Sequence, residues 1–138
     1  MIALDTNAVV RLLVEDDEEQ AAVVRRLVQS AETSGGAILI LSEVVLETVW
    51  VLESVYECSR ADVVCYLDTL LAVSVVQLPD RDSIRNALAH YRKGGDFADH
   101  LIVSQARKHQ ATRIFSFDRH LQEQHPGLVT SDPTTAGG

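Results

Sequence analysis

The chain has 138 residues, 46% of them apolar, and its 12 basic and 20 acidic side chains give a net charge of −8. This length and apolar content predict one folded domain with its own core and exclude a disordered chain. The acidic balance argues against a nucleic-acid partner, unless carboxylates gather around a metal ion that reverses the local charge. RNA therefore stays among the possible substrates.

The two cysteines, Cys58 and Cys65, match neither a CxxC pair nor zinc-finger spacing. Free thiols of this kind are typical of a reducing compartment. No stretch approaches the ~18 apolar residues of a membrane span, and no basic segment of a signal peptide follows Met1. We therefore expect a cytoplasmic protein with no membrane partner.

The first half of the chain alternates short apolar runs with helical patterns. The run IALD (2–5) predicts a buried strand, and residues 18–32 carry apolar side chains at helical spacing. The apolar run at 37–41 predicts a second strand. Ser42 is suited to cap the next helix, over 42–57, which we expect to be mostly buried.

The second half continues the alternation. SRAD at 59–62 matches a capping box with Asp in the Glu position, and it predicts a helix to about Ala72. The patterns that follow predict, in chain order, a strand at 73–78, helices at 80–93 and 96–110, and a strand at 112–117. Residues 1–130 then make one domain, and residues 131–138 a short polar tail that frays.

Short apolar strands separated by helices predict an α/β fold, with a parallel sheet covered on both faces. In such sheets, ligands bind at the carboxyl ends of the strands. Asp5 ends the first predicted strand and Asp118 follows the fourth. Glu47 lies in the second turn of the helix after the second strand, so all three belong to the edge where a ligand is expected.

Each of these acids also has an ordinary explanation. Asp5, Asp96 and Asp118 could each cap a helix. Glu43 lies in a first helical turn, where the helix dipole favours an acid. Glu47 lies within the apolar run VVLETVWVL, where we expect its charge to be desolvated unless an Arg or a metal ion pairs with it. We therefore prefer Glu47 to its rival Glu43.

Asp99 shares a helical face with Ile102, Val103 and Ala106, at spacings of three, four and seven residues. We expect this face to point to the core, which is an unusual place for a carboxylate. A solvated acid in the first turn is the alternative.

Together, Asp5, Glu47, Asp99 and Asp118 make a stronger pattern than any one of them. Mutual repulsion disfavours gathering carboxylates unless a hard divalent cation neutralises them. Oxygen ligands suit Mg²⁺ or Mn²⁺. Such ions polarise a phosphoryl oxygen and lower the pKa of a bound water. The predicted chemistry is phosphoryl transfer, with phosphodiester hydrolysis as one case.

The histidines form no metal-binding motif, and we expect all five at the surface: His90, His100, His109, His120 and His125. No phosphate-binding glycine loop and no nucleophile elbow occur in the sequence.

Four motifs in order resemble a PIN domain, and most closely the VapC-type toxins of prokaryotic toxin–antitoxin pairs. These are LDTN at 4–7, LETVWVL at 46–52, DFADHLIVSQA at 96–106 and SFDRHL at 116–121. The resemblance runs from Ile2 to about Leu121. It implies a central parallel sheet of four to five strands, flanked by helices on both faces, and a metal-dependent endoribonuclease.

The resemblance also implies roles for single residues. The catalytic acids would be Asp5, Glu47, Asp99 and Asp118, with Asp5 and Asp99 as ligands of Mg²⁺ or Mn²⁺ and Glu47 and Asp118 as further ligands. Supporting residues would be Thr6, Asn7 and Ser116. Asp96 is an additional acid that departs from the family pattern, and we place it beside the site as a further supporting residue. The implied partners are an RNA substrate, a cognate antitoxin protein and a second copy in a homodimer. His100 stands where many relatives have a small residue.

Two other functions fit an acidic pocket. A receiver-like phosphoacceptor domain also binds Mg²⁺ beside a parallel sheet. Such a domain normally has two acids in tandem and a strand-end Lys, whereas Asp5 stands alone and Lys93 and Lys108 lie in or after helices. A non-catalytic binding module, whose acids only cap helices, is the second alternative.

Overall fold

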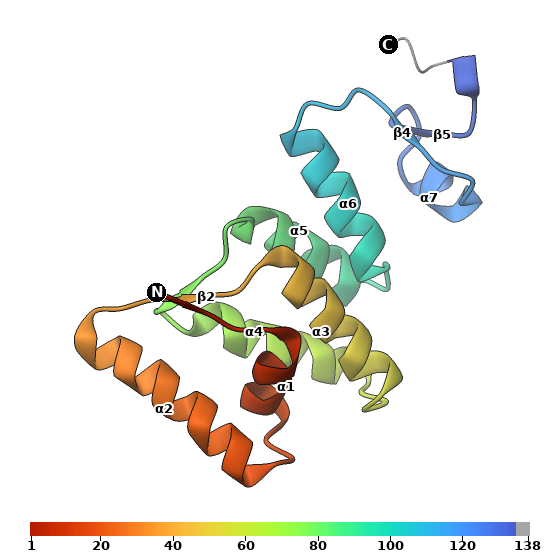
Figure 1. Ribbon diagram of the computed structural model, residues 1–138. Coiled ribbons are helices and arrows are strands. Elements are labelled where there is room, and N and C mark those ends of the chain that lie inside the picture. Colours follow the sequence, from red (N-terminus) through yellow and green to blue (C-terminus); the bar gives the residue numbers. More distant parts are fainter. Residues whose placement is uncertain (135–138) are drawn as a thin grey trace.

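The computed structural model describes residues 1–134. Its elements, shown in Figure 1, follow in this order: β1 (Ile2–Ala3), α1 (Thr6–Val14), α2 (Glu18–Ser34), β2 (Ile38–Leu39), α3 (Ser42–Ser54), α4 (Arg60–Ala72), β3 (Val76–Gln77), α5 (Arg81–Arg92), α6 (Phe97–Lys108), β4 (Ile114–Phe115), α7 (Arg119–Gln124) and β5 (Val129–Thr130). The predicted tail at 131–138 lies outside the described residues beyond Thr134. None of the helices within 1–134 has the length and apolar character to cross a membrane.

Every predicted helix and strand is present, although each strand is shorter than predicted. The capping box is confirmed, because the Ser59 hydroxyl accepts a hydrogen bond from the Asp62 amide at 3.1 Å. The prediction of Ser42 as a cap is wrong. Leu41 holds that position, and the Ser42 hydroxyl donates to Glu43 instead. The pattern missed α1, whose nine residues follow Asp5 directly, and the two-residue strand β5.

All strand pairs are parallel, which confirms the predicted α/β class. The strands are divided between two sheets, one with the order β1-β2-β3 and one with β4 beside β5. The resemblance implied one central sheet of four to five strands. Residues 1–134 contain five strands, but β1 and β4 do not pair with each other. Figure 1 shows β4, α7 and β5 on the far side of α6 from the N-terminus.

One large core unites most of the chain. The sheet contributes Ile38 and Val76 to it, and the helices α1 to α6 each bury at least one apolar side chain there, among them Val9, Val24, Leu52, Leu67, Ile84 and Leu101. We call residues 1–108, from β1 to α6, the body. Its helices are held mainly by this shared burial, since isolated helices of their length are marginal in water.

A second, much smaller core lies between α6 and the last elements. Only Val103, Leu121 and Val129 are buried in it, with Ile114 and Leu128 packed against them. We call residues 114–130, with β4, α7 and β5, the C-terminal unit. Val103 therefore ties this unit to α6, whereas Phe97 and Leu101 of the same helix belong to the core of the body.

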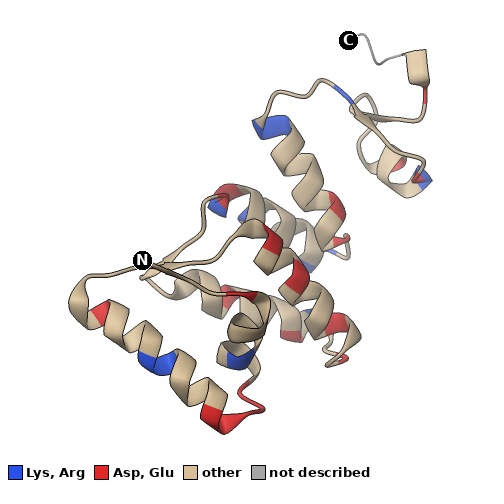
Figure 2. Ribbon diagram, in the orientation of Figure 1, with Lys and Arg blue, Asp and Glu red and all other residues tan. Residues whose placement is uncertain are grey.

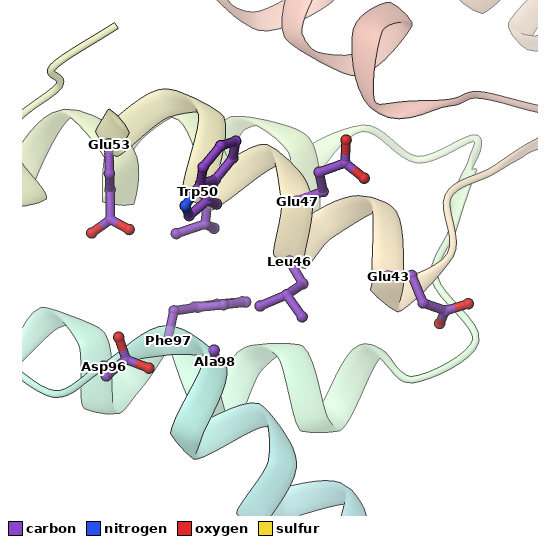
Figure 3. A pocket seen from close by; sticks show the side chains of 9 residues that line it. Glu43, Leu46, Glu47, Trp50, Glu53, Asp96, Phe97 and Ala98 are labelled. Atoms are coloured by element: carbon purple, nitrogen blue, oxygen red, sulfur yellow. The ribbon is translucent and has the colours of Figure 1, made fainter. Parts of the chain in front are cut away.

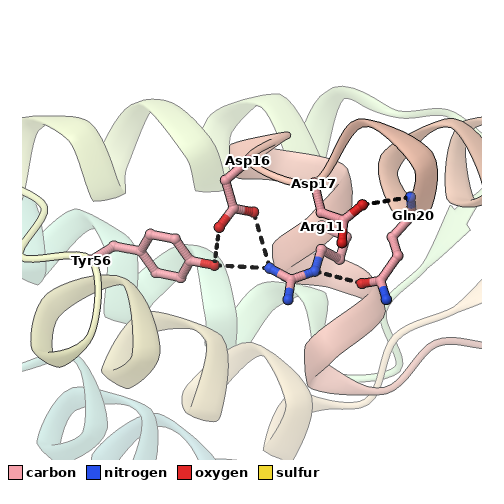
Figure 4. A network of polar contacts seen from close by, with 5 residues as sticks. All are labelled: Arg11, Asp16, Asp17, Gln20 and Tyr56. Carbon is pink, nitrogen blue, oxygen red and sulfur yellow. Dashed lines mark hydrogen bonds and ion pairs between the residues drawn. The ribbon is translucent and has the colours of Figure 1, made fainter.

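A network of polar contacts lies at the C-terminal end of α1 (Figure 4). The Arg11 guanidinium donates to Asp16 and to the Tyr56 hydroxyl, each at 3.0 Å, and to Gln20 at 2.7 Å. The Tyr56 hydroxyl donates to Asp16 at 2.9 Å. This hydrogen bond holds the pKa of Asp16 below its usual value. The network joins α1, the start of α2 and the residue stretch after α3.

Candidate acidic active site

Three of the predicted site acids begin helices. A backbone amide donates to each carboxylate: Ala8 to Asp5 at 2.9 Å, Asp99 to Asp96 at 2.9 Å, and Leu121 to Asp118 at 3.1 Å. The capping explanation is therefore correct for all three residues. It does not exclude a second role, because each cap bond uses one carboxylate oxygen and a carboxylate has several acceptor sites.

Asp99 lies close enough to two other acids to be perturbed by them. It sits half-buried in the first turn of α6. Burial raises its pKa above the usual value, and the charges of Asp96 and Asp118 raise it further, partly offset by His120. The starts of α6 and α7 thus bring Asp96 and Asp118 close enough to Asp99 for their charges to disfavour its ionised form.

The predicted core face of α6 is only partly correct. Val103 is buried, but in the small core, and the Ile102 side chain is 52% exposed. The face that enters the large core carries Phe97 and Leu101 instead. Asp99 consequently faces the junction with the C-terminal unit rather than the interior of the body.

The prediction that Glu47 is desolvated is wrong. The buried side of α3 carries Val45, Thr48, Val49 and Leu52, whereas Glu47 is exposed and Trp50 is 62% exposed. The polar side chain within this core is Thr48, whose hydroxyl donates to the Val44 carbonyl at 2.7 Å. Apolar residues of α3 occupy more of the helix surface than the body buries. The apolar pattern therefore did not indicate which side of the helix is buried.

A hollow of about 430 Å³ lies between α3 and the start of α6 (Figure 3). Its floor is apolar, with Leu46 and Phe97 pointing toward each other beside Trp50. Acids surround this floor: Glu43, Glu47, Glu53 and Asp96. Figure 2 shows the same pattern on the ribbon, with acidic positions spaced along α3 and at the start of α6.

Glu47 borders a second hollow as well, of about 260 Å³, which Thr6 and Asn7 also line. It therefore lies between the helix that Asp5 begins and the acidic hollow beside α6. Glu43 lines only the first of these hollows, and its carboxylate accepts the Ser42 hydroxyl at 2.9 Å. This placement supports the choice of Glu47, which stays a prediction.

Residues that the sequence analysis did not single out join α3 and α4 to α5 and to the loop before α6. The Tyr91 hydroxyl donates to Glu53 at 3.0 Å, and burial, with Glu53 as the next cause, raises the pKa of Tyr91 to about 12. Arg60 stacks over the Tyr91 ring at 4.3 Å and donates to the carbonyls of Tyr91 and Gly95. The spacing of Glu43, Glu47, Trp50 and Glu53 along one helix face could have revealed Glu53.

The remaining supporting residues lie beside the acids. The Ser116 hydroxyl accepts the Asp118 amide at 3.1 Å, and its carbonyl accepts the side chain of Gln122 at 2.9 Å. Ser116 thus shapes the turn that ends in Asp118. Thr6 and Asn7 form the wall of the second hollow.

The acids fall into two groups. Asp5 and Glu47 belong to α1 and α3, and Asp99 and Asp118 to the starts of α6 and α7. Their oxygen ligands suit Mg²⁺ or Mn²⁺ by chemistry. Nevertheless, no three Asp, Glu, His or Cys side chains among residues 1–134 are placed to share one ion. One chain in this arrangement does not assemble the predicted ligand set.

The prediction of five surface histidines is wrong for His100. Its ring is only 2% exposed and stacks on His90 at 4.1 Å, with His125 at 5.3 Å. Neither nitrogen of His100 has a hydrogen-bond partner among the described residues. Burial and the neighbouring histidines lower its pKa. Gly95 leaves room for the ring, since a Cβ there would lie 2.8 Å from Nε2.

Comparison with known proteins identifies the family. No curated protein matches the chain. One solved structure, VapC20 of Mycobacterium tuberculosis, described as a toxin that cleaves the sarcin–ricin loop, covers 90% of this chain and 95% of its own, with 18% identity and a TM-score of 0.42. The PIN domain model matches residues 2–125, which sets the receiver-like alternative aside. The chain belongs to the PIN domain family.

Proposed function

We propose that the protein is a metal-dependent endoribonuclease, the toxin of a toxin–antitoxin pair, which hydrolyses phosphodiester bonds in RNA. The approach of Asp96 and Asp118 to the half-buried Asp99 is the observation that carries this proposal, because burial, and then the charges of these two acids, raise the pKa of Asp99. Acids that destabilise one another in this way are typical of functional sites. Membership of the PIN family supports the same function.

Asp5 and Asp99 are the proposed ligands of Mg²⁺ or Mn²⁺, with Glu47 and Asp118 as further ligands. These residues bring only oxygen ligands, which is the set that hard divalent cations prefer. The two groups of acids must come together to complete the set.

The test is cleavage of a structured RNA by the purified protein. We expect cleavage with Mg²⁺ or Mn²⁺, none with EDTA, and a loss of at least about 100-fold in Asp5→Asn and Asp118→Asn, the range of removing one electrostatic stabiliser. Asn is as good a cap as Asp, so both variants keep their helices. Asp17→Asn is the matched control, because Asp17 caps α2 in the same way, at 3.1 Å from the Gln20 amide.

Cleavage that survives in both Asp5→Asn and Asp118→Asn would come from a contaminant and would refute the proposal. Folded protein that binds RNA or peptide without any metal-dependent cleavage would favour the non-catalytic binding module.

The choice between two glutamates needs its own measurement. Glu47→Gln should weaken Mn²⁺ binding by calorimetry, whereas Glu43→Gln should leave it unchanged, because only Glu47 also borders the hollow beside α1. A loss in Glu43→Gln alone would reverse the assignment.

The antitoxin would close the acidic hollow with a peptide that carries an Arg among apolar residues. The hollow offers carboxylates for a bidentate Arg contact and the apolar floor of Leu46 and Phe97. Trp50, the single tryptophan of the chain, lines this floor. Its fluorescence should change on titration with an apolar Arg-containing peptide, and it should not change when acidic peptides of equal length that lack Arg are added.

A further inference from the structure

β1 has one open edge. The amides of Ile2 and Leu4 donate to the carbonyls of Ala37 and Leu39, so both are used on the β2 side. The N–H and C=O of one residue point to the same edge of a strand, and those of the next residue to the opposite edge. The N–H and C=O of Ala3 therefore point to the edge of β1 that has no neighbouring strand among residues 1–134. An open edge of this kind is a template for pairing.

The open edge of β1 also leaves apolar surface uncovered. Ile2 pairs with Ile38, which pairs with Val76. Ile38 and Val76 are 1% and 2% exposed, whereas Ile2 is 50% exposed. The strands of a parallel sheet are normally buried. The exposure of Ile2 therefore indicates that a further strand could cover the open edge beside it.

β4 has a complementary edge. The amides of Ile114 and Ser116 donate to Leu128 and Thr130 of the β5 side, at 2.7 and 2.9 Å. The N–H and C=O of Phe115 therefore point away from β5. Phe115 is 51% exposed and packs edge-on against Phe117, which is 83% exposed. This edge too is parallel, apolar and without a neighbouring strand in the described chain.

The β4 strand of the same chain is held away from β1. Val103 of α6 packs with Leu121 and Val129 of the C-terminal unit, and His125 contacts the stacked rings of His90 and His100. These contacts keep the unit on the far side of α6, as Figure 1 shows. A second copy has no such restraint with respect to this β1 edge.

We infer that two copies exchange their C-terminal units, so that β4 of each copy pairs in parallel with β1 of the other and one active site combines Asp5 of one copy with Asp118 of its partner. Parallel pairing aligns the carboxyl ends of both strands; Asp5 follows the end of β1 after Leu4, and Asp118 follows the end of β4 after Ser116 and Phe117. The exchange is reciprocal and closes a two-fold dimer. It rests on the proposed function for its catalytic consequence only.

The first test blocks each edge. Ala3→Pro and Phe115→Pro each remove an outward amide donor and leave the bonds to β2 and β5 intact, which proline allows at strand edges. By light scattering, we expect the wild type at twice the 15.2 kDa of one chain and both variants at one chain mass. Val23→Ser removes an equally exposed apolar side chain from α2 and should stay dimeric.

The second test places the two acids on different chains. Asp5→Asn and Asp118→Asn copies are co-expressed with different tags and purified through both, so that every dimer is mixed. Each mixed dimer then has one intact site out of two, and about half of the wild-type cleavage should return. Both substitutions keep their helix caps, so this test does not depend on the proline variants folding.

The outcomes separate the two proposals. A monomeric wild type, a dimer that persists in both proline variants, or an active wild type whose mixed dimer is inactive would each overturn the exchange. If the wild type is a dimer that never cleaves RNA, and both proline variants are monomers, the nuclease is refuted and the exchange stands.

Discussion

The body and the C-terminal unit contain the same local design in different settings. In both, a short parallel strand leads to an aspartate that caps the next helix: Asp5 before α1 and Asp118 before α7. In the body, Val9 and Val10 of α1 are buried under α2 and α3. In the C-terminal unit, α7 buries one side chain, Leu121. The cap starts a helix, and tertiary burial decides how firmly that helix is held.

The largest expected effect is on the free energy of unfolding, and a Leu→Ala substitution in each core compares the two regions. Leu52→Ala removes a side chain with 0% exposure from the large core and should lower the free energy of unfolding by about 2–5 kcal/mol. Leu121→Ala, in the small core, should leave the main urea transition nearly unchanged and speed hydrogen exchange in 114–130 alone. Equal shifts of the urea midpoint would show that the two regions unfold as one.

The junction between the two regions should respond to pH. The pKa of His100 is lowered in the folded protein, so the unfolded chain binds the proton more readily, and stability falls as the pH drops below the ordinary value of 6.5. His100→Leu should reduce this loss, with a remainder from His125, whose pKa burial also lowers. It should stabilise the protein by about 1 kcal/mol, because two unpaired buried nitrogens disappear. Thermal unfolding between pH 7 and 5 measures both effects.

His109→Leu is the matched control for this experiment, since His109 is exposed just after α6. Its pH profile should follow the wild type. A wild-type stability that is flat over this range would contradict the role of His100.

A smaller effect should appear at Asp99. Its pKa is raised by burial and by Asp96 and Asp118, so the unfolded chain loses this proton first, and stability falls as the pH rises through that window. Asp99→Asn should therefore raise the Tm at neutral pH by about 1–3 °C while removing activity. Asp62→Asn, in the first turn of α4, should not raise the Tm, because the helix dipole stabilises an acid at that position.

The smallest expected change lies at the end of α1. Tyr56→Phe removes the hydroxyl that joins Arg11 and Asp16, and the variant should lose a little stability, about 1–2 °C in Tm. The pKa of Asp16 is lowered in the folded state. The difference between variant and wild type should therefore be present above pH 4 and disappear as the pH falls through the lowered pKa. A constant difference down to pH 2 would assign the effect to packing instead.

Much of the fold could be predicted because local signals agreed with it. Residues 18–34 form a helix with the expected apolar spacing, and residues 60–72 form one capped by Ser59 as predicted. The side of α3 that is buried could not be predicted, because its apolar residues cover more of the helix than the core does. The prediction that Glu47 is buried was consequently wrong; the buried polar residue of this run is Thr48.

The candidate site was predictable only in part for a related reason. Strand ends and helix caps fix where Asp5 and Asp118 lie within their own segments. Whether the segments meet depends on which strand pairs with β1, and an edge of two residues carries too little pattern to specify its neighbour. The histidine stack at His100 was missed because three histidines from distant segments share no sequence spacing.

The capping bonds of the acids also predict how related chains would diverge. At positions 5, 96 and 118, folding alone favours Asp, Asn or Ser, whatever the chain does chemically. A lineage that abandoned catalysis would still keep cap-forming residues there. Glu47 caps nothing and lies exposed in α3, so selection for folding would not retain it. Among relatives, position 47 is the place where surviving activity should be visible.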